Sequence, residues 1–182
     1  MLIERSMHPE WLSNAYLVAD EPGGTAVFVD SGAPLGPLHD VVEREGLKVT
    51  HVLTTHSHSD HVAGDAELVE RYGAEIVKGP LETGGLRIAA LETPGHADDH
   101  LCYVVNDTVC FTADLHFRDA VGGGPDAAQI RRSVWPGRTR SSGGSVITTS
   151  ITERRICAAS GPPPTASRKR RSAVKQTVSL TT

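Results

Sequence analysis

The sequence has 182 residues and a formal net charge of −4 at pH 7, a length that indicates one domain with a sizeable core. The charge is unevenly distributed, because residues 1–130 carry a net charge of −14 and residues 131–182 one of +10. Three cysteines are too few, and too odd in number, for a disulfide framework. No apolar run approaches the roughly 18 residues of a membrane span, and no signal-type segment begins the chain. We therefore expect a cytoplasmic protein with no membrane association.

The first predicted elements are a strand hairpin and a helix. Two β-branched and aromatic runs, residues 14–18 and 25–29, flank the turn sequence Glu-Pro-Gly-Gly and predict a hairpin at the edge of a sheet. Pro34 opens a predicted helix that keeps apolar residues at helical spacing to about Glu45 and ends at Gly46.

Strands and a second helix continue the pattern of an α/β fold. A strand at residues 49–54 leads into a polar loop, and a helix is predicted at residues 62–72. The face of that helix expected to be buried is Val62, Ala66, Val69 and Tyr72. Further strands are predicted at residues 74–78, 86–91, 101–105 and 108–112, the last two as an antiparallel pair.

The polar loop at residues 55–61, Thr-His-Ser-His-Ser-Asp-His, has three imidazoles and a carboxylate within six positions. A polar surface loop rich in His is the alternative, but H-x-H-x-D-H directly after an apolar strand is much more specific than one H-x-H. Such a mixture of nitrogen and oxygen donors suits zinc, iron or manganese better than calcium or magnesium. The candidate ligands in this loop are His56, His58, Asp60 and His61.

Two later strand ends deliver further polar groups. His96 follows one strand in Thr-Pro-Gly-His, and Asp114 closes the next hairpin in Phe-Thr-Ala-Asp. A dinuclear hydrolytic site needs about three ligands per metal, an acidic bridge and an open position for water. The repetition indicates that His96 and Asp114 face the same cleft as the loop at 55–61.

This ordered motif series resembles that of the metallo-β-lactamase superfamily in its glyoxalase II-like (hydroxyacylglutathione hydrolase-like) branch, over roughly residues 10–134. The resemblance implies an α/β fold of the αββα sandwich type with the site at one edge. It implies a hydrolase that cleaves a thioester or related acyl bond of a small-molecule substrate with metal-bound hydroxide. It also implies that His56, His58 and His96 hold one metal, that Asp60 and His61 belong to a second, and that Asp114 bridges. Asp60 would double as the catalytic proton acceptor.

The sequence departs from the family pattern toward its C-terminal end. Dinuclear members usually supply another His there, whereas all nine His of this chain lie between His8 and His116. The nearest comparable string is Trp-Pro-Gly-Arg at residues 135–138, and a protonated guanidinium cannot ligate a cation. We therefore predict one tightly held metal and a second site that is weak or empty.

Residues 135–182 contain only seven Leu, Ile, Val or Phe among 48 residues and carry a net charge of +8, which is typical of disorder. We therefore predict a metallo-β-lactamase-like domain at residues 1–134, incomplete at its C-terminal end, and a basic tail at residues 135–182. A reading-frame change near Val134 would explain the tail. A genuine basic tail could instead contact a polyanion, although the absence of interleaved aromatics argues against nucleic-acid binding.

Two other functions remain open. A persulfide dioxygenase-like oxidoreductase would need one iron, which His56, His96 and Asp114 could hold, and a metal-binding remnant would have no activity.

Several single residues also have two interpretations. Asp30 could orient a ligand His or cap the next turn, and His100 could line the pocket or be satisfied by the backbone. His116 lies close enough to Asp114 to contact metal or substrate. Ordinary surface or strand-end positions are expected for His8, His39 and His51.

Overall fold

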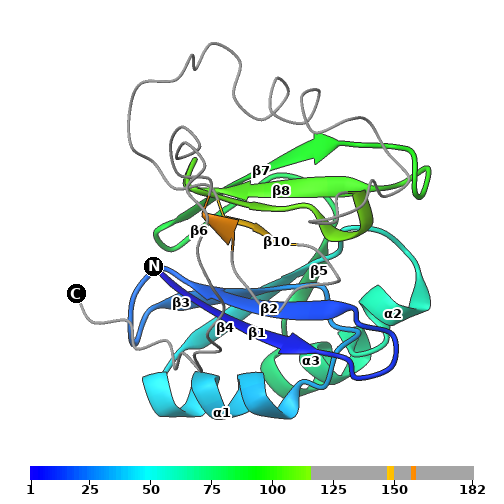
Figure 1. The fold of residues 1–182 in the computed structure, drawn as a ribbon. Coiled ribbons are helices and arrows are strands. Elements are labelled where there is room, and N and C mark those ends of the chain that lie inside the picture. Colours follow the sequence, from blue (N-terminus) through cyan, green and yellow to red (C-terminus); the bar gives the residue numbers. More distant parts are fainter. Residues whose placement is uncertain (116–146, 150–156, 159–182) are drawn as a thin grey trace, which may run out of the picture.

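The computed structural model describes residues 1–115, 147–149 and 157–158. Two sheets lie face to face, and a layer of helices covers the outer face of the first sheet (Figure 1). The boundary expected at residue 134, most of the expected tail and His116 lie outside the described residues. The two-region division therefore stays a prediction.

The first sheet has the strand order β1-β2-β3-β4-β5. Its first three strands run antiparallel, whereas β3, β4 and β5 run parallel, so the carboxyl ends of β3 and β4 meet at one edge of the sheet. The predicted hairpin is not at the sheet edge, because β1 pairs with β2 along its whole length. The bounds are Leu2–Met7 for β1, Asn14–Ala19 for β2, Thr25–Val29 for β3, Lys48–Leu53 for β4 and Glu75–Val77 for β5.

Two helices bury their apolar faces on the outer side of the first sheet. The helix α1, Gly36–Glu45, ends at Gly46, whose φ of 64° is left-handed as the sequence indicated. The helix predicted at residues 62–72 is instead two helices, α2 at Ser59–Val62 and α3 at Asp65–Tyr72, broken at Ala63-Gly64.

The buried face predicted for this helix holds at Tyr72, which packs partly buried against the core, but not at Val69. Val69 is 41% exposed, whereas Leu68 is fully buried against the sheet. Leu68 and Tyr72, four positions apart, form the face of α3 that meets the core.

The second sheet has the order β11-β10-β9-β8-β7-β6. The strands β6 to β9 form an antiparallel run, β10 pairs parallel with β9, and β11 pairs antiparallel with β10. Two short pieces of the expected tail thus lie in the sheet. The bounds are Leu81–Thr83 for β6, Leu86–Glu92 for β7, Leu101–Val105 for β8, Val109–Phe111 for β9, Ile147–Thr149 for β10 and Cys157–Ala158 for β11.

The main core lies between the two sheets. Val27 and Leu53 of the first sheet pack in the same buried cluster as Ile88 and Tyr103 of the second, which is the sandwich that the sequence predicted. In the described part of the chain, helices cover only the first sheet, so three of the four αββα layers are seen. None of the described helices has the length and apolar composition needed to cross a membrane.

Candidate metal centre

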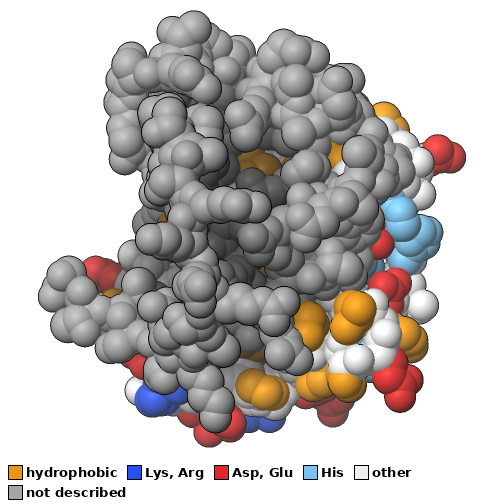
Figure 2. Space-filling model, in the orientation of Figure 1, with side chains coloured by type: hydrophobic (Ala, Val, Ile, Leu, Met, Phe, Trp, Pro, Cys, Tyr) orange, Lys and Arg blue, Asp and Glu red, His pale blue; other side chains and the backbone are white. Residues whose placement is uncertain are grey.

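All six predicted metal ligands come together at one edge of the sandwich. Residues 55–61 extend from the carboxyl end of β4, and His96 lies in the connection between β7 and β8. Asp114 lies in a short 3₁₀ turn, Ala113–Leu115, directly after β9. In Figure 2, histidine side chains reach the surface on the right of the molecule beside acidic side chains. His58 is exposed, so the site opens to solvent on one side.

Hydrogen bonds between the two sheets fix this edge. The backbone N–H of Leu101 donates to the carbonyl of Thr55 over 2.8 Å, and the buried Tyr103 hydroxyl donates to the carbonyl of Thr54 over 2.9 Å. The strand β8 therefore holds the start of the His loop directly. The first of the ligand-bearing segments is therefore positioned by regular secondary structure of both sheets.

His56, His58 and His96 form the first ligand group. The Nδ1 atom of His58 lies 3.1 Å from Nε2 of His56 and 3.0 Å from Nε2 of His96. Zinc binds imidazole nitrogen at about 2.0–2.1 Å, so tetrahedral ligand atoms lie roughly 3.3–3.4 Å apart. The three ring nitrogens therefore have nearly the spacing that a small divalent cation requires.

The second ligand group is centred on the buried His61. Its Nε2 atom lies 3.4 Å from Oδ1 of Asp114 and 3.6 Å from Oδ2 of Asp60. The other oxygen of Asp114, Oδ2, lies 3.3 Å from Nε2 of His96. Asp114 thus presents one oxygen to each group, which is the position of a bridging carboxylate.

Two atoms of the second group are buried without a hydrogen bond. Among the described residues, neither Nε2 of His61 nor Oδ1 of Asp114 has a hydrogen-bond partner. Buried polar atoms are nearly always satisfied in folded proteins. A cation between these two atoms would satisfy both, so the residues present fit a metal at this position.

The charges of the site also fit a cation. Burial lowers the pKa of His56 to about 3, so its imidazole is neutral at pH 7 and can offer a lone pair. Burial opposes the charge of His61 as well, but the carboxylates of Asp114 and Asp30 outweigh it and raise the pKa of His61 to about 10. Burial tends to raise the pKa of Asp114, but His61 outweighs it and the net shift is downward. A cation bound here would replace the proton of His61 between the carboxylates.

The carboxylate of Asp30 bonds residues of the His loop, and among the described residues it makes no hydrogen bond to the turn that follows it. Its Oδ1 accepts the backbone N–H of Thr55 over 2.8 Å, and its Oδ2 accepts from Nδ1 of His61 over 2.7 Å. A carboxylate that holds one ring nitrogen fixes the other toward a metal. Of the two interpretations of Asp30, the contacts favour the orienting one.

The structure changes the assignment of two other histidines. His100 is buried, with Nδ1 2.9 Å from the hydroxyl of Thr93 and its ring stacked at 5.0 Å from that of His56. Of its two interpretations, backbone satisfaction does not hold, because this nitrogen meets a side chain and Nε2 has no partner among the described residues. Burial lowers the pKa of His100 to about 4.

The prediction of an ordinary surface or strand-end position for His39 was wrong. Its ring is buried between α1 and α3, where Nδ1 lies 2.7 Å from the hydroxyl of Tyr72 and Nε2 lies 2.8 Å from Glu67. A signal existed in the sequence, because His39 precedes Val42 by three positions and so shares its buried helical face.

Sequence reasoning gave no role to Asp99, which joins the two ligand-bearing loops. Its Oδ2 accepts from the hydroxyl of Ser57 over 2.5 Å and pairs with the ammonium of Lys78. Ser57 stands between two candidate ligands, and Asp99 follows His96 by three residues. The bonds to Lys78 and Ser57 hold the pKa of Asp99 well below its usual range.

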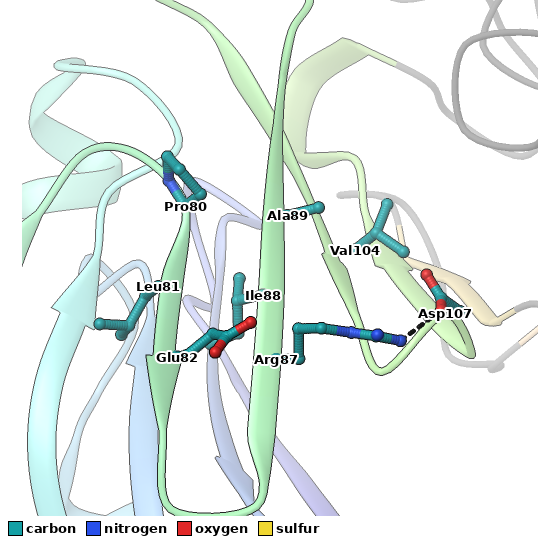
Figure 3. A pocket seen from close by; sticks show the side chains of 8 residues that line it. All are labelled: Pro80, Leu81, Glu82, Arg87, Ile88, Ala89, Val104 and Asp107. Carbon is teal, nitrogen blue, oxygen red and sulfur yellow. Dashed lines mark hydrogen bonds and ion pairs between the residues drawn. The ribbon is translucent and has the colours of Figure 1, made fainter.

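A separate hollow of about 340 Å³ lies on the second sheet against β6, β7 and β8 (Figure 3). Arg87 and Asp107 form an ion pair of 2.5 Å at its side. None of the candidate ligands lines it. The lining residues are Pro80, Leu81, Glu82, Arg87, Ile88, Ala89, Val104 and Asp107.

Comparison with known proteins identifies the fold and the relatives. The family model of the metallo-beta-lactamase superfamily matches residues 8–84. The crystal structure of ETHE1 from Myxococcus xanthus superposes with a TM-score of 0.63 and 25% sequence identity, over 86% of this chain and 78% of that one. The predicted metallo-β-lactamase-type sandwich is therefore confirmed.

Curated relatives carry the name hydroxyacylglutathione hydrolase. The protein from Rhodopseudomonas palustris (strain HaA2) is 35% identical over 126 residues, which are 59% of this chain and 49% of the relative. The protein from Rhizobium meliloti (strain 1021) is 33% identical over 144 residues, which are 68% of this chain and 55% of the relative. The chain spans about half the length of the curated relatives that it matches.

Proposed function

We propose that this chain, a member of the metallo-β-lactamase superfamily, is a metal-dependent hydrolase that cleaves a thioester or a related acyl bond of a small molecule. The observation that carries the proposal is the pair of ligand groups that Asp114 faces with one oxygen each. Similarity to hydroxyacylglutathione hydrolases supports the thioester. We also propose that the protein acts in the cytoplasm.

The ligands divide between two metal positions. His56, His58 and His96 would hold the first metal, Asp60 and His61 would hold the second, and Asp114 would bridge the two. Divalent ions held by these residues would supply a Lewis acid for the substrate carbonyl and would lower the pKa of a water from 15.7 to about 7. Zinc suits these donors, and iron or manganese would too.

Asp60 is the proposed proton acceptor. Its side chain is 27% exposed and lies 3.6 Å from Nε2 of His61, so it faces both the ligand group and solvent. This partly exposed position beside the ligand group is one from which its carboxylate could accept a proton during attack on the carbonyl.

We propose that the two metal positions differ in affinity. Among the described residues the second position has one imidazole, that of His61, whereas three imidazoles line the first. Loss of a ligand weakens binding at least as much as loss of a residue that orients one, which costs about 10–100-fold. The first position would thus hold its metal tightly and the second weakly.

Metal analysis of the purified protein, paired with a thiol-release assay, tests the proposal. After dialysis we expect one tightly held equivalent, and we expect thiol release from a glutathione thioester. The variant His58→Ala should lose both, whereas His8→Ala, a histidine outside the ligand groups, should lose neither. Two retained equivalents would contradict the unequal affinities, and full thioester hydrolysis by His58→Ala would contradict the hydrolytic site.

A persulfide dioxygenase-like oxidoreductase is the second candidate function. His96 and Asp114 approach within 3.3 Å, so these two and His56 could hold a single iron without a terminal His. The likeness to the ETHE1 structure gives this candidate some support, less than the hydroxyacylglutathione hydrolase relatives give the first. Oxygen uptake with glutathione persulfide, in place of thiol release from a thioester, would decide for it. Bound metal with neither activity would indicate an inactive remnant.

A further inference from the structure

We propose that Thr55 is a positioning residue that links Asp30 to His56 through its hydroxyl group. The carboxylate of Asp30 then orients one candidate ligand in each of the two groups. The inference rests on the proposed metal site but not on the reaction catalysed there. All four residues involved, Asp30, Thr55, His56 and His61, are buried, so water cannot replace their hydrogen bonds.

The single hydroxyl proton of Thr55 determines the direction of the hydrogen bonds. Oγ1 donates it to Oδ2 of Asp30 over 2.8 Å. The same Oγ1 lies 3.1 Å from Nδ1 of His56, and with its proton already given it can only accept there. The ring of His56 must therefore carry its proton on Nδ1. Its Nε2 keeps a lone pair, 3.1 Å from Nδ1 of His58 in the first ligand group.

The second branch starts from the same oxygen. Oδ2 of Asp30 also accepts from Nδ1 of His61 over 2.7 Å, which turns Nε2 of His61 toward Asp60 and Asp114. A ring nitrogen ligates a metal only when it has no proton, and the bond made by the other nitrogen decides which one that is. Asp30 thus determines which ring nitrogen carries the proton directly in His61 and through Thr55 in His56.

The backbone of Thr55 is held independently of its hydroxyl. Its N–H donates to Oδ1 of Asp30, and its carbonyl accepts from the N–H of Leu101, both over 2.8 Å. Replacing Thr55 by Val, which has the same shape, therefore removes the hydroxyl bonds to Asp30 and His56, while the backbone bonds still hold the loop in place. The neighbouring Thr54 offers a matched control, because its buried hydroxyl has no hydrogen-bond partner among the described residues.

The experiment compares Thr55→Val, Thr55→Ser and Thr54→Val with the unmodified chain. Competition with a chelator measures zinc affinity, and ¹⁵N NMR of the imidazoles in the metal-free protein reports which nitrogen of His56 carries the proton. We expect Thr55→Val to weaken the tightly bound zinc about 10–100-fold and to move the His56 proton from Nδ1 to Nε2. Thr55→Ser should restore both readouts, and Thr54→Val should change neither.

The outcomes separate this inference from the proposed function. If Thr55→Val keeps the Nδ1 proton on His56, or if Thr55→Ser is as impaired as Thr55→Val, Thr55 is not the positioning residue. The unmodified chain could hydrolyse no thioester while Thr55→Val still changes the zinc affinity and the His56 proton position as expected. The proposed reaction then fails and the inference about Thr55 stands. The tautomer is read without metal, so even a chain that binds no zinc gives a result.

Discussion

The substitution Gly32→Ala should displace half of the candidate metal centre. A Cβ on Gly32 would lie 1.7 Å from the backbone oxygen of Asp60 and 2.8 Å from the nitrogen of His61. Carbon and oxygen atoms in close contact are about 3.3 Å apart, so the segment would have to move by roughly 1.6 Å. Metal–ligand distances tolerate only about ±0.2 Å. The second ligand group therefore cannot keep its geometry.

The segment at Asp60 and His61 cannot move away from residue 32 without breaking other hydrogen bonds. Ser31 donates its backbone N–H to the carbonyl of His61 over 2.8 Å, and its hydroxyl bonds both the N–H of Gly64 and the carboxylate of Asp65. Overpacking at such a site typically costs about 1–3 kcal/mol of stability. A misplacement of about 1 Å near the reacting atoms costs on the order of 10²-fold in rate.

Zinc titration, thioester hydrolysis and urea unfolding together measure the effect. For Gly32→Ala we expect second-site affinity to fall by at least about 10-fold, while zinc on His56, His58 and His96 is retained. The control is Gly36→Ala, because nothing lies within 4 Å of a Cβ added there. If Gly32→Ala binds a second zinc and hydrolyses substrate as well as Gly36→Ala does, the reasoning is refuted.

Three further predictions concern the helices, the rim of the site and the metal. His39→Ala should lower the free energy of unfolding in urea by roughly 1–3 kcal/mol, because Tyr72 and Glu67 lose a buried partner; unchanged stability would contradict this. Asp99→Asn should cost under about 1 kcal/mol, since the Lys78 and Asp99 side chains are 33% and 40% exposed, but should speed zinc release to a chelator. If Asp99→Asn and the unmodified chain release zinc at the same rate, Asp99 has no role in joining the loops. Zinc at 100 times its Kd should stabilise the protein by about 2.7 kcal/mol, and a chelator that leaves Tm unchanged would argue against tight binding.

Local signals in the sequence determined the strands, the first helix and the identity of the six candidate ligands. Alternating and β-branched runs located most strands, because side chains that face one core recur at every second position. The end of α1 followed from Gly46, since its left-handed backbone suits glycine. His56, His58, Asp60 and His61 fall within six positions, so their proximity needed no knowledge of the fold.

Tertiary structure decided how those ligands are held. Asp30 and His61 are 31 positions apart, and their bond exists only because β3 and β4 run parallel and end at the same edge. The fit of Gly32 beneath Asp60, the burial of His39 between two helices and the contact of Ser57 with Asp99 depend in the same way on segments distant in the chain. Periodicity describes one segment at a time and carries no information about which segments meet. The sequence alone therefore named the candidate ligands, and the packing of the sheets decided the direction in which each one points.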